Sequence, residues 1–201
     1  FWRLTGDKAV LSAQYLYWCA RQLTYPKGDG PETRQLAVNH RDVLKTLKIY
    51  GVCPESAWTE RVMAFDDEPP ADRFVHALKY RLKTYTSVAE SMLYTVLQIH
   101  VAVSAIVMLY EDWVRPDMYS TDGGVTPAPR TTVMMPGYGG AQLGYHSVCL
   151  SGFDKANGLI RIRNSWGIEW ADRGYAWIPV QFLLTGHLRD FWAVTHVENE
   201  A

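Results

Sequence analysis

The clearest alternation of apolar and polar residues lies in the last third of the chain, over residues 144–179. Two isoleucines alternate with two arginines over 160–163, which is the period of a strand with one buried face. A Gly-containing turn at 154–158 precedes them, and before that turn stand three further apolar residues: Val148, Leu150 and Phe153. The pattern predicts two strands joined by a tight turn, with a third strand over 174–179.

The first third of the chain instead shows helical periodicity. Ser12 reads as an N-cap for a helix over 13–23, with apolar residues along one face at Tyr15, Leu16, Cys19 and Leu23. Residues 1–8 resemble the end of an earlier helix, closed by Gly6. Further helices are expected over 41–50, 71–81 and 90–98, strands over 82–88, 101–110 and 189–194, and a long loop over 119–143.

Composition narrows the class of protein. The chain has 201 residues, of which 48% are hydrophobic, and a formal charge of −1. These values describe a globular protein of one large or two small domains. The near-neutral balance gives no reason to expect nucleic acid or an anionic membrane surface as a partner, and no apolar run reaches membrane-spanning length. The three cysteines do not show whether the protein works in an oxidising or a reducing compartment.

The predicted hairpin brings two chemically useful side chains together. His146 falls near the start of one strand and Asn164 at the end of the next. An imidazole held by a side-chain amide supplies the base and the orienter of a nucleophile–base–orienter arrangement. The alternative is a core hairpin that carries one hydrogen-bonded histidine and one turn asparagine.

The same stretch resembles the papain-like cysteine peptidases. In that family the histidine begins a strand of the form G-H-A-V…G-Y/F-D, and the asparagine lies in N-S-W-G-x-x-W…G-Y. The matching segments here are Tyr145-His146-Ser147-Val148, Gly152-Phe153-Asp154, Asn164-Ser165-Trp166-Gly167, Trp170 and Gly174-Tyr175. Residues 52–58 are similar to a G-V-C-P-E-S-x-W segment of bacterial members of the family. The sequence therefore resembles the bacterial members most.

The resemblance implies a role for each matched residue. His146 would be the general base and Asn164 its orienter, while Trp166 would cover their hydrogen bond from water. Trp170 would line the leaving-group side of the cleft. With less support, Tyr145 would wall the pocket for the side chain before the scissile bond, and Gly30 would face the substrate backbone. The resemblance implies no cofactor and no metal.

The implied fold is α+β, with two lobes and the cleft between them. Residues 1–85 would form a helical left lobe that is incomplete at its N-terminus. Residues 86–201 would form an antiparallel, β-rich right lobe that carries the histidine and the asparagine. The expected partner is a peptide or protein substrate bound in the cleft between the lobes.

The nucleophile of the family has no matching segment in this chain. The family carries it on Q-G-x-C-G-S-C-W, with the cysteine at a helix N-terminus. We expect such a segment upstream of Phe1, on the same polypeptide or as a retained cleaved fragment that fills the groove of the central helix.

The three cysteines present are expected to serve other purposes. Cys19 precedes His146 by 127 residues and Asn164 by 145, close to the papain spacing of about 130–150. However, it lies two turns into its predicted helix on an apolar face, where burial raises a thiol pKa. By the resemblance, Cys19 also aligns with a structural cysteine of the family, and Cys53 is expected to be structural. Cys149 lies three residues after His146 on one strand, so it should point to the opposite face and into a core.

Three functions therefore remain open. The first is a cysteine endopeptidase whose thiol lies upstream of residue 1. The second is a pseudopeptidase that keeps the fold as a binding or structural subunit. The third keeps the Cys–His–Asn chemistry but transfers the acyl group to an amine.

Overall fold

The computed structural model describes residues 6–25, 37–59, 67–99, 101–114 and 140–197. Contacts divide the chain into two compact units, with the boundary between Tyr85 and Thr86. The second unit ends at Val194, and the end of the last strand from Thr195 belongs to the first unit. The expected helix tail before Gly6, the Gly30 loop and most of the 119–143 loop lie outside the described residues.

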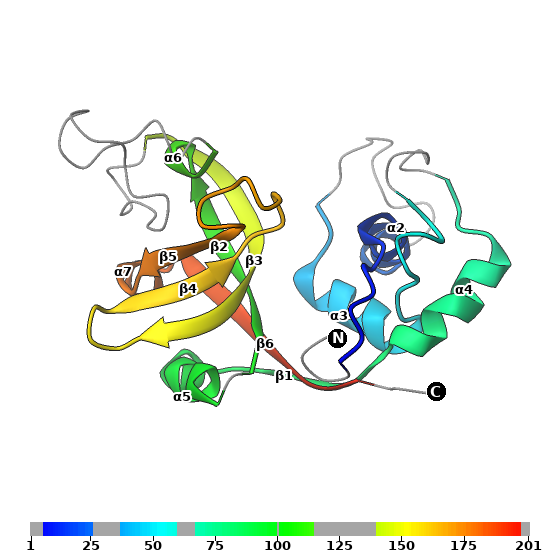
Figure 1. The fold of residues 1–201 in the computed structure, drawn as a ribbon, viewed down its shortest axis with the longest axis horizontal. Helices are drawn as coiled ribbons and strands as arrows, with labels where there is room; N and C mark the ends of the chain where they lie inside the picture. Colours follow the sequence, from blue (N-terminus) through cyan, green and yellow to red (C-terminus); the bar gives the residue numbers. More distant parts are fainter. Residues whose placement is uncertain (1–5, 26–36, 60–66, 100, 115–139, 198–201) are drawn as a thin grey trace. The chain divides into compact units, whose positions relative to one another are not determined.

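The first unit is helical. Its helices are α2 (Ala13–Thr24), α3 (His40–Ile49) and α4 (Ala71–Ala77), followed by a 3₁₀ turn, η1 (Leu78–Tyr80) (Figure 1). The predicted cap of α2 is confirmed, because the Ser12 hydroxyl accepts a hydrogen bond from the Tyr15 backbone N–H at 3.1 Å. α3 begins one residue earlier than expected, since Asn39 caps it by accepting from the Arg41 N–H at 2.9 Å.

The third helix is shorter than its sequence pattern predicts. The pattern continues to residue 81, whereas α4 ends at Ala77 and η1 carries the chain to Tyr80. Arg81 is already extended, because strand β1 (Leu82–Ser87) begins at the next residue. The tighter 3₁₀ turn thus replaces the last helical turn before the strand.

The core of the first unit forms around α2. Its buried members come from α2, from the segment that follows α3 and from the α4–η1 turn: Tyr15, Cys19, Val52, Cys53, Trp58, Ala77 and Tyr80. The ring of Phe74 meets the rings of Tyr15 and Trp18 edge-on. The apolar face predicted for the helix over 13–23 is therefore the face of α2 that packs into the core of the first unit.

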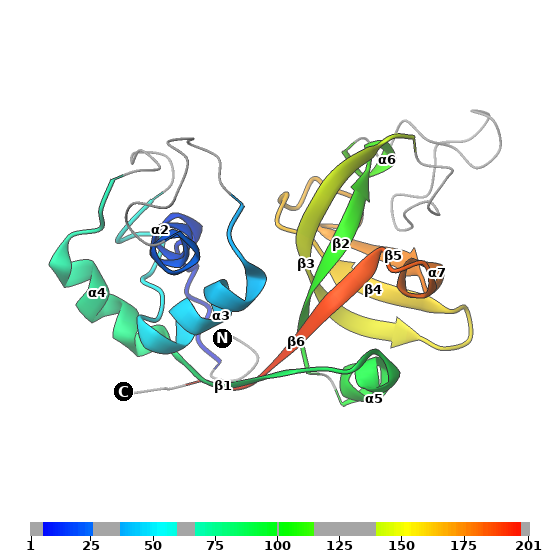
Figure 2. The same ribbon diagram turned by 180° about the vertical axis from the view of Figure 1, so that it is seen from behind.

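The sheet has six strands in the order β1-β6-β2-β3-β4-β5. After β1 these are β2 (Val103–Tyr110), β3 (Gln142–Asp154), β4 (Leu159–Arg163), β5 (Tyr175–Pro179) and β6 (Leu188–Val197). The pairs β2–β3, β2–β6, β3–β4 and β4–β5 are antiparallel. Short helices join the strands: η2 (Glu90–Met92), α5 (Leu93–Gln98), α6 (Glu111–Val114) and α7 (Gln181–Leu184). Figures 1 and 2 show α6 at the end of β2 that adjoins the start of β3.

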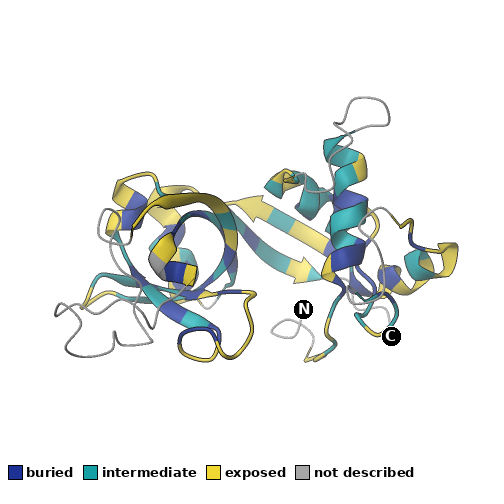
Figure 3. Cartoon of the chain, turned by 90° about the horizontal axis from the view of Figure 1, so that it is seen from above, coloured by how far each residue is buried: buried dark blue, intermediate teal, exposed yellow. Residues whose placement is uncertain are grey.

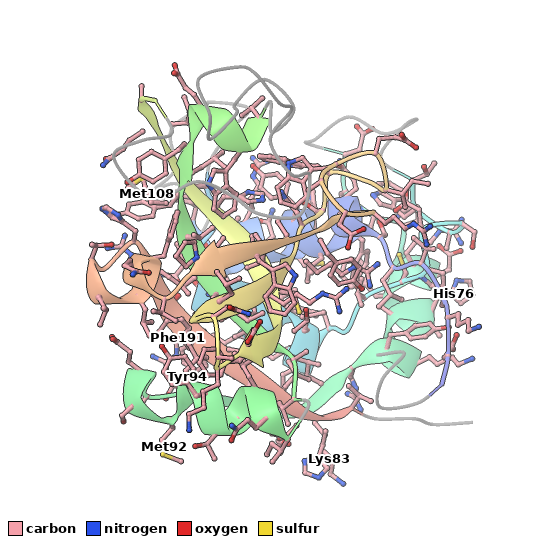
Figure 4. The ribbon with its side chains drawn as sticks, turned by 60° about the vertical axis from the view of Figure 1, so that its left-hand side comes forward. His76, Lys83, Met92, Tyr94, Met108 and Phe191 are labelled. Carbon is pink, nitrogen blue, oxygen red and sulfur yellow. The ribbon has the colours of Figure 1, made fainter. Side chains whose placement is uncertain are left out.

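The strands of the second unit curl around a single apolar core (Figure 3). Alternate residues of β2 and β4 point into it, as the isoleucine–arginine pattern predicts: Ile160 and Ile162 are fully buried. Tyr94 of α5 packs against this core and stacks on Phe153 with 4.1 Å between ring centroids. Figure 4 shows Tyr94 and Phe191 toward one end of the unit and Met108 toward the other.

The predicted turn between β3 and β4 is confirmed in detail. The Asp154 carboxylate accepts hydrogen bonds from the backbone N–H groups of Ala156 and Asn157 and from the Asn157 side chain. These bonds lower the pKa of Asp154. Gly158 closes the turn with a φ of +62°, a value that suits a residue without a Cβ.

Two expectations for β3 are wrong. The strand begins at Gln142, inside the region expected to be loop, because residues from Gln142 pair with β2 as far as Tyr110. Cys149 does point away from the face of Val148 and Leu150, but it is half-buried and lies outside the core cluster. The core is built by the opposite face of the strand.

The helices offer no membrane span. Among the described residues, none is both long and apolar enough to cross a bilayer.

Candidate active site

His146 and Asn164 form the hydrogen-bonded pair that the hairpin predicts. His146 Nε2 lies 2.8 Å from Asn164 Oδ1. His146 is near the start of β3, and Asn164 directly follows β4, the strand that pairs with β3. The antiparallel pairing therefore brings together two residues that are 18 positions apart.

The Asn164 oxygen accepts two hydrogen bonds. Besides the imidazole, the backbone N–H of Ser165 donates to it at 2.8 Å. Because a backbone N–H can only donate, the atom facing it must be the amide oxygen and not the amide nitrogen. His146 Nε2 must then carry the hydrogen, which leaves Nδ1 of the neutral ring as the proton acceptor. The geometry selects the tautomer that a general base needs.

Backbone hydrogen bonds hold the loop that begins at Asn164. The Asn164 N–H donates to the carbonyl oxygen of Gly174 at 2.9 Å, and the Gly174 N–H donates to that of Trp170 at 2.7 Å. Gly174 has a φ of +85°, and a Cβ there would lie only 3.0 Å from the Gly167 carbonyl oxygen. Asn164 itself is buried, so its side chain has little freedom to leave the imidazole.

An indole ring lies beside the imidazole. The ring centroids of Trp166 and His146 are 5.1 Å apart and their planes differ by 33°. Trp166 is 36% exposed, whereas Asn164 is 7% exposed. Trp166 thus lies beside the imidazole with part of its surface open to solvent. Its role in covering the His146–Asn164 hydrogen bond remains a prediction.

Trp166 is supported in turn by Trp170, which meets it edge-on at 5.6 Å. Trp170 is buried, and its indole N–H donates to the Trp113 carbonyl oxygen at 2.7 Å. Its expected position on the leaving-group side of a cleft therefore stays a prediction, whereas its packing under Trp166 is observed.

Sequence reasoning missed Trp113. It lies in α6, directly after the buried strand β2, and is completely buried against Trp170 and Phe182. The available signal was a bulky aromatic residue three positions after the end of a continuous apolar run at Tyr110.

The two weaker candidates differ in outcome. Tyr145 is 54% exposed, and the guanidinium of Arg189 lies over its ring. Gly30 lies outside the described residues. The structure therefore brings together His146, Asn164, Trp166 and Trp170, with Tyr145 adjoining them in the chain.

Two of the three described cysteines are poorly suited to nucleophilic attack. Cys19 and Cys53 are buried, and burial raises the pKa of the Cys19 thiol to about 12 and that of Cys53 to about 11. The Cys149 thiol lies 3.7 Å from the Leu150 carbonyl oxygen. In the described part of the chain, no group of three or more His, Cys, Asp or Glu side chains could hold a metal ion.

Structural comparison identifies the architecture. Xylellain, a cysteine protease from Xylella fastidiosa, superposes with a TM-score of 0.77 over 96% of this chain and 72% of its own, at 24% identity. The chain has the papain-like α+β fold. A cysteine protease of Carica candamarcensis matches with a TM-score of 0.59 over 97% of this chain and 82% of its own, at 20% identity. Procathepsin B of Trypanosoma congolense matches with a TM-score of 0.64 over 99% of this chain and 64% of its own, at 17% identity.

Sequence comparison points the same way. An uncharacterised peptidase C1-like protein of Acanthamoeba polyphaga mimivirus is 26% identical over 168 residues, which cover 78% of this papain-like chain. The chain spans about half, 51%, of that relative's length. No family model matches the chain.

Proposed function

We propose that this chain belongs to a cysteine peptidase in which His146 is the general base and Asn164 its orienter. The observation that carries the proposal is that the Asn164 side-chain oxygen accepts two hydrogen bonds. This fixes the proton of His146 on Nε2 and leaves Nδ1 as the acceptor. A purely structural histidine has no need of a fixed tautomer next to a partly exposed indole.

The reaction follows from that tautomer. His146 Nδ1 takes the proton of a cysteine thiol, and the thiolate attacks the carbonyl carbon of the scissile peptide bond. The imidazolium then gives its proton to the departing amine, which leaves a thioester. A water molecule, deprotonated by the same Nδ1, releases the acid and regenerates the thiol. Asn164 holds the ring in place through both charge states.

The thiol in this proposal comes from a segment that precedes the present sequence. Two observations support this assignment: the burial of Cys19 and Cys53, and the raised pKa of each thiol. A nucleophile placed at a helix N-terminus beside His146 would instead have its thiolate favoured.

The same burial favours a second candidate, a pseudopeptidase in which the preceding segment lacks the cysteine. The cleft would then bind peptides without cleaving them. Acyl transfer to an amine is the third candidate, and it differs from hydrolysis only in the acceptor of the thioester.

The test uses the protein with its preceding residues present. Fluorogenic peptides report turnover, and an epoxide-type thiol inactivator followed by mass mapping reports the nucleophile. We expect His146→Ala to lower kcat/KM by about 10²–10⁴. The matched control is His76→Ala, an exposed histidine on α4 (Figure 4), which should leave the rate unchanged.

The outcomes separate the candidates. An adduct upstream of Phe1 with loss of activity supports the peptidase. Labelling at Cys19 with loss of activity would overturn the assignment of the thiol. Peptide binding without turnover or adduct supports the pseudopeptidase, and amide products formed with an added amine support acyl transfer.

A further inference from the structure

An asparagine and a glycine stand next to each other in the exposed turn that joins β3 to β4. The Asn157 side chain is exposed, and Gly158 follows it in the chain. Because a glycine has no Cβ, its backbone nitrogen can approach the side-chain carbonyl carbon of the residue before it. Such a neighbour makes asparagine one of the chemically labile residues of proteins. Neither residue takes part in the proposed active site.

The nitrogen that would attack this carbon is not held by a hydrogen bond. The Gly158 carbonyl oxygen accepts the Val180 N–H at 2.9 Å, whereas the Gly158 N–H has no partner among the described residues. The Asn157 side chain makes one hydrogen bond in the same part of the chain, from its Nδ2 to Asp154 Oδ2 at 2.7 Å. The turn therefore leaves the nitrogen free and the side chain open to solvent.

Asn164 offers a comparison within the same chain, since it also precedes a small residue, Ser165. There the Ser165 N–H donates to Asn164 Oδ1 at 2.8 Å, and the same oxygen lies 2.8 Å from His146 Nε2. Asn164 is also 7% exposed. Both the nitrogen and the side-chain amide are held, so hydrogen bonds must break before they can react. The fold thus protects Asn164 and leaves Asn157 unprotected.

We propose that Asn157 is a modification site, at which the protein loses ammonia and gains a carboxylate with time. The Gly158 nitrogen bonds to the side-chain carbonyl carbon of Asn157, and the amide nitrogen leaves as ammonia with the proton that the Gly158 nitrogen gives up. Water then opens the cyclic imide at either carbonyl carbon and yields aspartate or isoaspartate. The net change is hydrolysis of one amide by water. It does not depend on the proposed peptidase function.

The new carboxylate would meet one that the turn already contains. The Asn157 side chain, its backbone N–H and the Ala156 N–H donate to Asp154 and lower the pKa of that carboxyl. Conversion replaces Nδ2, a donor to Asp154, by a negatively charged oxygen. Two carboxylates at hydrogen-bonding distance repel each other, so the turn should loosen. The same turn joins the strand that carries His146 to the strand that leads to Asn164.

The first test ages the folded protein, with its preceding residues, at mildly alkaline pH, and maps the converted positions by peptide mass spectrometry. We expect Asn157 to convert at least about tenfold faster than Asn164, because hydrogen bonds hold the latter. Asn39, whose Oδ1 caps α3, should also stay intact. In urea the difference between Asn157 and Asn164 should shrink, since unfolding frees both.

Gly158→Ala is the matched control for the attacking nitrogen. The added Cβ would lie 3.7 Å from Val180 Cγ2, an ordinary contact, so the fold has room for it. This variant should convert more slowly at Asn157. Equal rates at Asn157 and Asn164 in the folded protein would contradict the proposal. An Asn157 that stays intact while the urea-unfolded chain converts there would overturn it as well.

The second test measures the effect of the new charge through Asn157→Asp. We expect this variant to lower the melting temperature by about 2–4 °C, because the turn loses a hydrogen bond and gains a repulsion. Adding Asp154→Asn restores one donor and one acceptor with the charges exchanged, and should recover most of the loss. A loss that persists in the double variant would contradict the repulsion between positions 154 and 157.

Discussion

The indole N–H of Trp170 donates to the backbone carbonyl oxygen of Trp113 at 2.7 Å, across 57 positions of the chain. This bond ties the loop that carries Asn164 and Trp166 to the helix that follows β2. Both tryptophans are buried, so the bond is formed away from water.

Replacing Trp170 by Phe should lower the free energy of unfolding by about 1–3 kcal/mol, because it leaves a buried carbonyl group without its donor. Urea titration followed by circular dichroism measures the change. The matched control is Trp177→Phe, a half-buried tryptophan on β5, which should cost clearly less. Equal losses in the two variants would show that ring volume, and not the hydrogen bond, sets the cost.

Asn164→Ala should lower kcat and leave the Michaelis constant nearly unchanged, if the proposed function holds. The imidazole loses the acceptor that holds its tautomer, yet no substrate contact is removed. The drop should be smaller than the loss of about 10²–10⁴ expected for His146→Ala, because a base misplaced part of the time still works. Steady-state kinetics check this, and a variant as active as the parent protein would contradict the orienting role.

The thiols of Cys19 and Cys53 should resist alkylation in the folded protein. With a pKa of about 12, the Cys19 thiol is ionised in only about one molecule in ten thousand at pH 8. Iodoacetamide treatment with mass mapping should modify half-buried Cys149 first, and the other two only after denaturation. Rapid modification of native Cys19 would contradict the burial described here.

The same raised pKa values predict a loss of stability in alkali. The folded state holds its thiol protons at a pH where the unfolded chain, with an ordinary pKa of about 8.5 for cysteine, releases them. Stability should therefore be complete below about pH 8 and fall as the pH rises toward the folded values of about 11 and 12. Thermal melting at several pH values measures the slope. Cys19→Ala should make the slope shallower, because it removes one of the two raised pKa values.

Gly51→Ala should destabilise the first unit strongly. Gly51 has a φ of +74°, and a Cβ there would overlap the carbonyl oxygen of Ala77. Gly6→Ala is a matched control, since Gly6 has nearly the same φ, +77°, with no atom within 4 Å of the added carbon. The control should cost only about 1 kcal/mol for the left-handed backbone, and thermal melting should show a larger loss for Gly51→Ala.

Local patterns in the sequence predicted most of the elements and the central pair. Ser12 predicted the start of α2, because capping depends on a few neighbouring residues. The strands around His146 and Asn164 followed from period-two alternation and a turn rich in Asp, Asn and Gly. The fold class followed from matched motifs and is supported by the solved structures of the same fold.

What the sequence could not predict depends on partners distant in the chain. Trp113 acquires its role only through Trp170 and Phe182, which lie 57 and 69 positions away. Cys149 was expected in a core because it points away from His146, but the core is on the His146 side of β3. α4 ends early because the chain must be extended where β1 begins. The helical periodicity of the sequence does not encode this requirement.

The His146–Asn164 pair is joined by a short stretch of chain, and this has a consequence for how the protein assembles. Closing an 18-residue separation costs less conformational entropy than closing the 57 residues between Trp113 and Trp170, and low sequence separation favours early formation during folding. The pairing of β3 with β4 brings His146 beside Asn164. We therefore predict that this pair forms early in folding, before the contacts between residues that are far apart in the chain.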